Sequence, residues 1–254
     1  MKLRTAAALA GAFTLLASAG AALALAPPPA FIAAAVADAG RPAADKARDV
    51  YRLPGEMLVY AEVKPGAKIA EMLPGGGYFT RVFAKAVGPK GKVYAFVPGE
   101  MLGARPQAAD GVKAIAANAA YSNVFVLATP LRTIAAPASA DVVWTSQNYH
   151  DLHNKGFGGD IAAVNKAVFS ALKPGGTYVV LDHAAVKGSG VSATETLHRI
   201  DADAVKSEVI TAGFVLDGES DALRHPTDVH TGKVFETGIR GKTDQFILKF
   251  KKPK

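Results

Sequence analysis

The residues best suited to chemistry gather in one short segment, TSQNYHDLHN, at positions 145–154. Its candidate groups are Asn148, Tyr149, His150, Asp151 and His153. Histidine exchanges a proton near neutral pH, so either histidine could act as a general base, and the tyrosine could line a pocket beside it. The same residues could instead pack the loop and cap a helix. The segment is a candidate catalytic loop whose position depends on the surrounding elements.

A second candidate is the loop in EMLPGGGYFT, positions 71–80, where three glycines separate an apolar run from a helix-like stretch. Glycine lets the backbone approach a ligand closely, and the start of a helix presents free N–H groups. The spacing is not G-x-G-x-x-G, and no Gly-Lys-Ser/Thr follows, so it is neither a dinucleotide fingerprint nor a phosphate-binding P-loop. The alternatives are a ligand-binding loop and a tight strand-to-helix turn.

Strand-like and helix-like segments alternate along most of the chain. We expect strands at 68–73, 92–97, 123–128, 140–147, 177–184, the FVLDG segment from 214, and 244–251. We expect helices at 78–87, 107–119, 160–172 and 201–213, the last capped by Asp201. The early strands are apolar on both faces, as in a parallel sheet covered on both sides. The pattern predicts a Rossmann-like, doubly wound α/β fold whose ligands bind beyond the carboxyl ends of the strands.

The beginning of the chain is typical of a secretory leader, with Lys2 and Arg4 before an apolar stretch and small residues. We therefore expect a signal peptide at 1–26, a linker or loose N-terminal arm at 27–48, and one domain at 49–254. An uncleaved anchor is the alternative. Cleavage predicts a periplasmic or secreted protein with no stable membrane span.

Composition excludes several classes of site. The chain has no cysteine, which excludes disulfides, cysteine nucleophiles and thiolate metal sites. Removal of residues 1–26, with Lys2 and Arg4, lowers the formal charge from +7 to 7 − 2 = +5, which is mildly basic. No zinc-finger spacing or aromatic-basic pattern favours nucleic-acid binding. The histidine and acid spacings match no metal-ligand motif, so we expect no metal. Nothing in the sequence indicates the oligomeric state.

The chain resembles class I S-adenosylmethionine-dependent methyltransferases in three features: the order of its elements, the segment EMLPGGGY after the first strand, and the segment LKPGG before the fifth strand. More closely, the chain resembles a branch of predicted bacterial methyltransferases that carry secretory leaders. In that branch the first loop reads acid-x-x-Pro-Gly-Gly-Gly-aromatic. HRIDADAVKSEVITAGF and FETGIRGKTDQFILKFKKP also resemble it, so the similarity runs from about residue 45 to the end.

The resemblance implies a seven-stranded sheet with the last strand antiparallel and S-adenosylmethionine across the carboxyl edge of its first half. Gly75 and Gly77 would pass close to the methionine part, Glu71 would fix the loop or the amino group, and Tyr78 would open the next helix. The predicted cofactor-binding set is Glu71, Pro74, Gly75, Gly76, Gly77, Tyr78, Val97, Pro98, Thr129 and Asn148. Methyl transfer needs an aligned acceptor and often a base, which makes Tyr149, His150 and His153 the predicted catalytic residues.

The ends of the second and third strands depart from the common pattern. Most members carry an acid after the second strand for the ribose hydroxyls, whereas this chain has Val97 and Pro98, with Glu100 three residues late. Where many members have an acid near the adenine amine, this chain offers Thr129. The departures predict either unusual cofactor binding or its loss.

Other polar residues are expected on the acceptor side of the same edge. The predicted substrate-binding set is Asp151, Asp182, His183 and Arg199. Asp182 and His183 could alternatively make strand-end hydrogen bonds, and Arg199 could anchor an acidic group or form a salt bridge. The long segment 220–243 has the length of a lid or binding loop.

Three functions follow. The first is an exported methyltransferase acting on a small molecule or an envelope component. The second is a non-catalytic ligand-binding domain that kept the fold. The third, a dinucleotide-dependent oxidoreductase, is disfavoured because the chain lacks the glycine fingerprint and an acid after the second strand.

Overall fold

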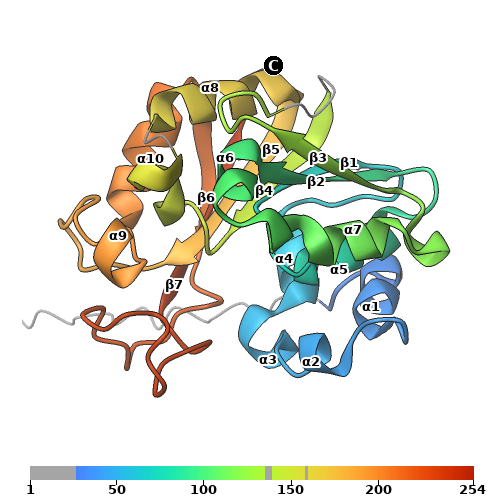
Figure 1. Cartoon of the computed structure of the whole chain (residues 1–254), viewed down its shortest axis with the longest axis horizontal. Helices are drawn as coiled ribbons and strands as arrows, with labels where there is room; N and C mark the ends of the chain where they lie inside the picture. The colour runs from blue at the N-terminus through green and yellow to red at the C-terminus, as the bar shows by residue number, and fades with distance from the viewer. Residues whose placement is uncertain (1–26, 135–138, 158–159) are drawn as a thin grey trace, which may run out of the picture.

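A computed structural model describes residues 27–134, 139–157 and 160–254. The described part contains a single seven-stranded sheet with the strand order β3-β2-β1-β4-β5-β7-β6 (Figure 1). The strands are β1 (Lys68–Met72), β2 (Lys92–Pro98), β3 (Val124–Thr129), β4 (Ala140–Ser146), β5 (Leu172–His183), β6 (Val215–Ser220) and β7 (Gln245–Lys251). Neighbours from β3 to β5 run parallel, whereas β7 is antiparallel to both β5 and β6. The predicted Rossmann-like fold with an antiparallel last strand is confirmed.

Helices cover both faces of the sheet because alternate strand residues point to opposite sides. The helices are α1 (Ala30–Ala37), α2 (Ala43–Lys46), α3 (Asp49–Arg52), α4 (Pro54–Tyr60), α5 (Tyr78–Val87), α6 (Gly99–Ala104), α7 (Asp110–Ala116), α8 (Ile161–Ala171), α9 (Thr194–Leu197) and α10 (Ala202–Thr211). Short 3₁₀ turns lie at η1 (Pro106–Ala109), η2 (Ala119–Tyr121), η3 (His150–His153) and η4 (Lys155–Phe157).

The core has one half on each face of the sheet. On one face, Phe79 and Phe83 of α5 pack with the fully buried Trp144 of β4, and α1, α4 and α7 complete the layer. On the other face, Val168 of α8 and Val205 of α10 belong to a second cluster. A β1 residue such as Ile69 and its neighbour Ala70 therefore point into different clusters.

The N-terminal segment is folded where the sequence predicted a linker or loose arm. Two helices, α1 and α2, lie within residues 27–48, and α1 packs on α5 through the buried Ile32 and Ala35. The α1 sequence, AFIAAAVA, is apolar on every face, so it carries no helical period to recognise. The expected leader, residues 1–26, lies outside the described residues. No helix in the described part has the length and hydropathy needed to cross a bilayer.

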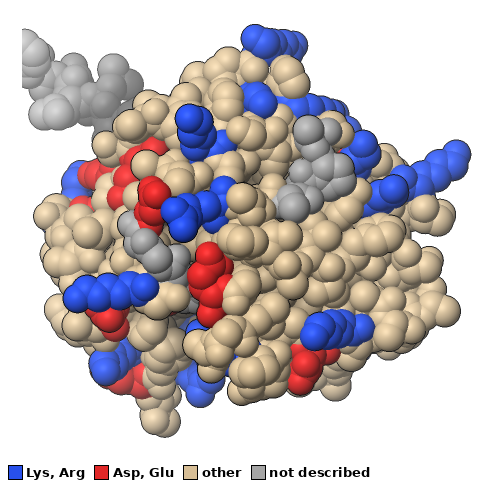
Figure 2. Space-filling view, turned by 45° about the horizontal axis from the view of Figure 1, so that its top comes forward, with Lys and Arg blue, Asp and Glu red and all other residues tan. Residues whose placement is uncertain are grey.

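The N-terminal helices and the long 221–244 segment reach the same end of the molecule (Figure 1). Residues of both line one cavity there, so the two segments are neighbours in space. Basic and acidic side chains are interspersed over the visible face of the molecule, between broad uncharged areas (Figure 2).

Candidate active site

The glycine loop joins β1 to α5 through a run of left-handed backbone. Leu73, Gly75 and Gly77 have φ of 49°, 56° and 79°. A Cβ on Gly77 would overlap the side chain of Ile115 in α7, whereas one on Gly75 would meet nothing within 4 Å. Gly77 thus lets the loop pack on α7, and Gly75 leaves space above the loop.

Glu71 lies beneath this loop with only 3% of its surface exposed. Thr80 Oγ1 donates a hydrogen bond of 2.5 Å to its Oε2. Burial raises the pKa of Glu71 to about 8, although Thr80 and the charges of Arg52 and Arg81 oppose that rise. The carboxyl is therefore mostly protonated at neutral pH and becomes a carboxylate once a cation is placed beside it.

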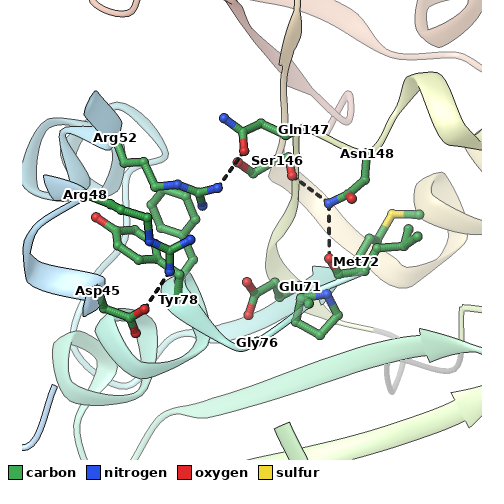
Figure 3. A pocket seen from close by; sticks show the side chains of 14 residues that line it. Asp45, Arg48, Arg52, Glu71, Met72, Gly76, Tyr78, Ser146, Gln147 and Asn148 are labelled. Atoms are coloured by element: carbon green, nitrogen blue, oxygen red, sulfur yellow. Dashed lines mark hydrogen bonds and ion pairs between the residues drawn. The ribbon is translucent and has the colours of Figure 1, made fainter. Parts of the chain in front are cut away.

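The N-terminal helices supply the opposite wall (Figure 3). The Tyr78 hydroxyl donates to Asp49 Oδ1 at 2.5 Å, and the guanidinium groups of Arg48 and Arg52 lie 5.0 and 4.8 Å from the Tyr78 ring. Arg52 also donates to Oε1 of Gln147, across the site, at 2.6 Å. Gln147 has φ of 62°, a conformation that costs energy outside glycine and often marks a functional site.

Three adjoining cavities run along the carboxyl ends of the strands. The central one, of about 230 Å³, lies over Glu71, Gly75 and Tyr78. A second, of about 300 Å³, shares Gly75 and Asn148 with it and extends over Val97 toward Met101. A third, of about 460 Å³, shares Arg52 and Gln147 with the first. We call this continuous surface the edge groove and its parts the central, β2-side and β5-side cavities.

The predicted residues of the first loop line the edge groove except Gly77, which packs against α7 instead. The central cavity is lined by Glu71, Pro74, Gly75, Gly76, Tyr78 and Asn148, among others. Asn148 Nδ2 donates to the carbonyls of Leu73 and Ser146 at 3.1 and 2.6 Å. That pair of bonds ties the loop after β4 to the glycine loop.

The end of β2 fits the sequence expectation only in part. Val97 lines the β2-side cavity and Pro98 ends the strand. Glu100, the late acid, instead accepts hydrogen bonds from the Leu131 N–H at 3.0 and 3.2 Å. Thr129 Oγ1 donates to the carbonyl of Thr133 at 2.8 Å. The side-chain oxygens of Glu100 and Thr129 thus make local hydrogen bonds to the backbone.

Two polar residues of the β2-side cavity were missed by the sequence analysis. Arg105, which directly follows α6, and Gln107, which lies in η1, line it. Gln107 lies at the start of the helix that the sequence predicted at 107–119, and Arg105 lies just before it. Neither residue directly follows a predicted strand. Their only signal in the sequence was that two polar residues lie a short distance after the expected second strand.

The structure separates the predicted catalytic residues. Tyr149 is fully buried, donates to Glu208 Oε2 at 3.0 Å and accepts from Asn165 Nδ2 at 2.8 Å. His153 Nε2 lies 3.2 Å from the same Glu208 oxygen. Both side chains therefore point from η3 toward α8 and α10, which gives them contacts that hold the loop.

His150 points the other way, toward the end of β5. Its Nδ1 lies 2.8 Å from Asp182 Oδ1, and its Nε2 lies 3.5 Å from Asp151 Oδ1. Burial alone would lower the pKa of His150, but the charge and hydrogen bond of Asp182 outweigh it and raise the pKa. Asp151 lines the β2-side cavity, and burial raises its pKa. The pair offers a proton acceptor next to the edge groove.

Within the described residues, one histidine-carboxylate group has metal-ligand spacing. Atoms of His150, Asp151 and His198 lie within 4.8 Å of one another. The sequence analysis, which expected no metal, did not single out His198 in this role. His198 Nδ1 lies 3.6 Å from Asp151 Oδ1, so a hydrogen-bonded cluster also accounts for the arrangement.

Of the predicted substrate-binding residues, His183 lines the β5-side cavity. Its Nδ1 shares a hydrogen bond of 2.7 Å with Thr243 Oγ1, and burial lowers its pKa to about 3, so the ring is neutral. Arg199 is fully buried and makes a two-pronged ion pair with Asp228 at 2.9 and 3.0 Å. Arg199 thus anchors the 221–244 segment. Of the two roles that the sequence left open for Arg199, the structure shows the salt bridge.

The seven-stranded sheet with an antiparallel β7, and a glycine loop at the carboxyl end of β1, define the class I methyltransferase fold. Known structures agree. A methyltransferase from Aquifex aeolicus matches with a TM-score of 0.58 at 17% identity, covering 82% of this chain and 95% of its own. One from Mesorhizobium loti gives 0.56 at 17%, covering 82% and 99%. The [4+2]-cyclase SpnF gives 0.60 at 15%, covering 80% of both chains.

At these identities the similarity establishes the fold and leaves the reaction open. The chain matches no family model. No curated protein sequence matches it either.

Proposed function

We propose that the protein is an S-adenosylmethionine-dependent methyltransferase. The observation that carries the proposal is the edge groove, which passes over a glycine loop whose Gly75 leaves open space. A side chain at that position would fill the space, as expected of a cradle for a ligand backbone.

The central cavity suits the methionine part of the cofactor. Glu71 would receive the ammonium group, because a cation beside it stabilises the carboxylate form. The methionine carboxylate would lie at the start of α5, where free N–H groups and the helix dipole favour an anion, with Arg48 nearby. The bound cofactor would supply an electrophilic methyl group.

The β2-side cavity suits the adenosine part. Val97 and Met101 offer apolar contact for a base, and Gln107 offers an amide for ribose hydroxyls in place of the usual acid. An amide both donates and accepts hydrogen bonds, so it can serve a hydroxyl pair without a charge. We assign ribose recognition to Gln107 and Arg105.

His150 is the catalytic residue we assign among the three predicted. The acceptor's proton would pass to Asp151 at the groove and on to His150, whose orientation is fixed by Asp182. Tyr149 and His153 would be positioning residues that hold η3 through Glu208.

Calorimetric titration with S-adenosylmethionine and S-adenosylhomocysteine, with NAD as the control ligand, tests the proposal. We expect micromolar binding of the first two and none of NAD. Gly75→Val should abolish that binding. Gly66→Val is the matched control, because Gly66 also has positive φ and open space but lies before β1, at the opposite end of the strand.

Absence of binding at millimolar cofactor would reject the methyltransferase and favour the second candidate, a non-catalytic ligand-binding domain. One observation supports that candidate. Glu100, the acid that follows the second strand, accepts hydrogen bonds from the Leu131 backbone N–H and so is engaged away from a ribose. NAD binding would instead favour an oxidoreductase.

We also propose that the protein works outside the cytoplasm, on a small molecule or an envelope component, after loss of residues 1–26. The support is the leader-like sequence alone. Fractionation of cells and N-terminal sequencing of the protein test it, and an intact N-terminus in the cytoplasmic fraction would reject it.

A further inference from the structure

The β5-side cavity is the largest part of the edge groove at about 460 Å³. It lies over the ends of β4 and β5, and its lining includes Tyr51, Arg52, Gln147, His183, Phe235 and Arg240. Because Arg52 and Gln147 also line the central cavity, an occupant would reach the methionine side of the groove.

The lining of this cavity is cationic and contains no acidic side chain. Arg48 has its own carboxylate, Asp45, at 2.5 Å. Arg52, by contrast, has the neutral Gln147 amide as its hydrogen-bond partner, and Arg240 lies 6.0 Å from the Phe235 ring. Within the described residues, neither Arg52 nor Arg240 forms an ion pair with a carboxylate.

The positive charge on Arg52 is energetically unfavourable in the free protein. Burial and the nearby charge of Arg48 lower its pKa, which means that the site disfavours the cation in the absence of a ligand. A bound anion would reverse that penalty. Guanidinium groups bind carboxylates through two parallel hydrogen bonds, so both arginines suit a carboxylate in particular.

Aromatic side chains flank the two arginines. Phe235 is 56% exposed although it lies beside the cavity, and Tyr51 lies on the opposing N-terminal helix α3. An exposed phenyl ring at a cavity mouth gains free energy when an apolar ligand covers it. The cavity therefore combines an anion site with a surface for a flat apolar body.

We propose that the methyl acceptor is a small aromatic carboxylate, bound through its carboxylate by Arg52 and Arg240 and through its ring by Tyr51 and Phe235. The inference rests on the proposed function. In the transfer, a lone pair on a hydroxyl or amino group of the acceptor forms the bond to the methyl carbon. The carbon–sulfur bond would break with its electrons remaining on sulfur, and S-adenosylhomocysteine would be released. The acceptor's proton would pass to water in the groove and from there to Asp151, which lines the β2-side cavity.

Calorimetry on the protein saturated with S-adenosylhomocysteine tests the inference with 4-hydroxybenzoate, 4-aminobenzoate and their neutral amides. We expect the carboxylates to bind at least tenfold more tightly than the amides. Arg240→Gln should remove that difference and Arg240→Lys should retain part of it. Arg132→Gln is the matched control, since Arg132 is also an exposed arginine but lines a separate cavity.

S-adenosylhomocysteine affinity, measured on the same variants, separates the two proposals. Retained cofactor-product binding with equal affinity for carboxylates and amides, or with no binding of either, overturns the acceptor assignment alone. An unaffected carboxylate preference in Arg240→Gln overturns it as well. Carboxylate binding without any S-adenosylhomocysteine binding overturns the methyltransferase instead.

Discussion

Nδ1 of His150 and Oδ1 of Asp182 lie 2.8 Å apart and join the loop after β4 to the end of β5. Asp182 also accepts the backbone N–H of His150 and of His183, each at 2.7 Å. Burial would raise the pKa of Asp182, but the charge and hydrogen bonds of His150 hold it below its ordinary value. One buried carboxylate thus orients the proposed base and the histidine of the acceptor cavity.

Asp182→Asn should lower kcat about 100-fold, because the orientation and basicity of His150 both depend on the carboxylate. Cofactor affinity should stay within about twofold, and the His150 pKa should fall in an NMR titration. Asp203→Asn, at an exposed aspartate in α10, is the control. An unchanged kcat together with a lowered His150 pKa would remove His150 from the mechanism.

Cofactor binding should release a proton near neutral pH. Glu71 is mostly protonated in the free protein, since burial raises its pKa to about 8, and an ammonium group beside it favours the carboxylate. Calorimetry at pH 7 in buffers of different ionisation enthalpy should show release approaching one proton. Affinity should therefore increase with pH up to about 8. Glu71→Gln should lose the proton release, and its retention would assign it to another group.

The same carboxyl should make folding stability depend on pH. Its pKa is 4.5 in the unfolded reference and about 8 when folded, so its stabilising contribution is complete below 4.5 and lost as pH rises through 8. Urea unfolding of wild type and Glu71→Gln from pH 4.5 to 9 measures the difference. The stability of wild type relative to the variant should fall over that range, and a flat difference would contradict the buried position.

Substitution of Gly75 and of Gly77 should affect different properties of the protein. Gly77→Val should destabilise the fold by a few kcal/mol, because its Cβ would overlap Ile115 at a positive φ. Gly75→Val should cost less stability yet abolish cofactor binding, since its Cβ would point into open space. Thermal unfolding and calorimetry on both proteins measure the two effects. Equal loss of stability would mean that Gly75 also serves packing.

Arg199→Met should destabilise the protein, and it should affect acceptor binding only indirectly, through the position of the 221–244 segment that Arg199 anchors. Removing one partner of a buried ion pair typically costs about 3–5 kcal/mol, because the other charge remains buried. Asp228 is that partner, and its own pKa is held low by backbone N–H groups and by Arg199, against the effect of burial. The double variant Arg199→Met/Asp228→Asn should recover part of the loss. No coupling in this cycle would contradict the anchoring role.

The sequence predicted the sheet well because most of its strands contain an apolar run that a glycine, proline or polar turn ends. Val93, for example, pairs with Val124 in parallel register, within the two predicted runs. The 3₁₀ turn η3 was not predictable in this way. It sends Tyr149 and His153 toward Glu208, whereas His150 points to Asp182, and nothing in NYHDLH distinguishes these directions.

The N-terminal contribution to the site was also hidden. Arg52 lies in a four-residue helix, and its partner Gln147 is 95 residues away along the chain. Such a contact depends on how α3 docks against the sheet edge. Local propensity carries no information about it, so the arginine lining of the edge groove became visible only in three dimensions.

Arg52 and Gln147 form one wall between the central and β5-side cavities. Two ligands that share a wall residue influence each other's affinity, and thermodynamics requires the influence to be equal in both directions. A ligand that holds Arg52 in place saves the second ligand the entropy of ordering it. If the two proposed ligands bind there, the 2.6 Å bond between these side chains would couple the two cavities, and we expect each ligand to raise the affinity for the other.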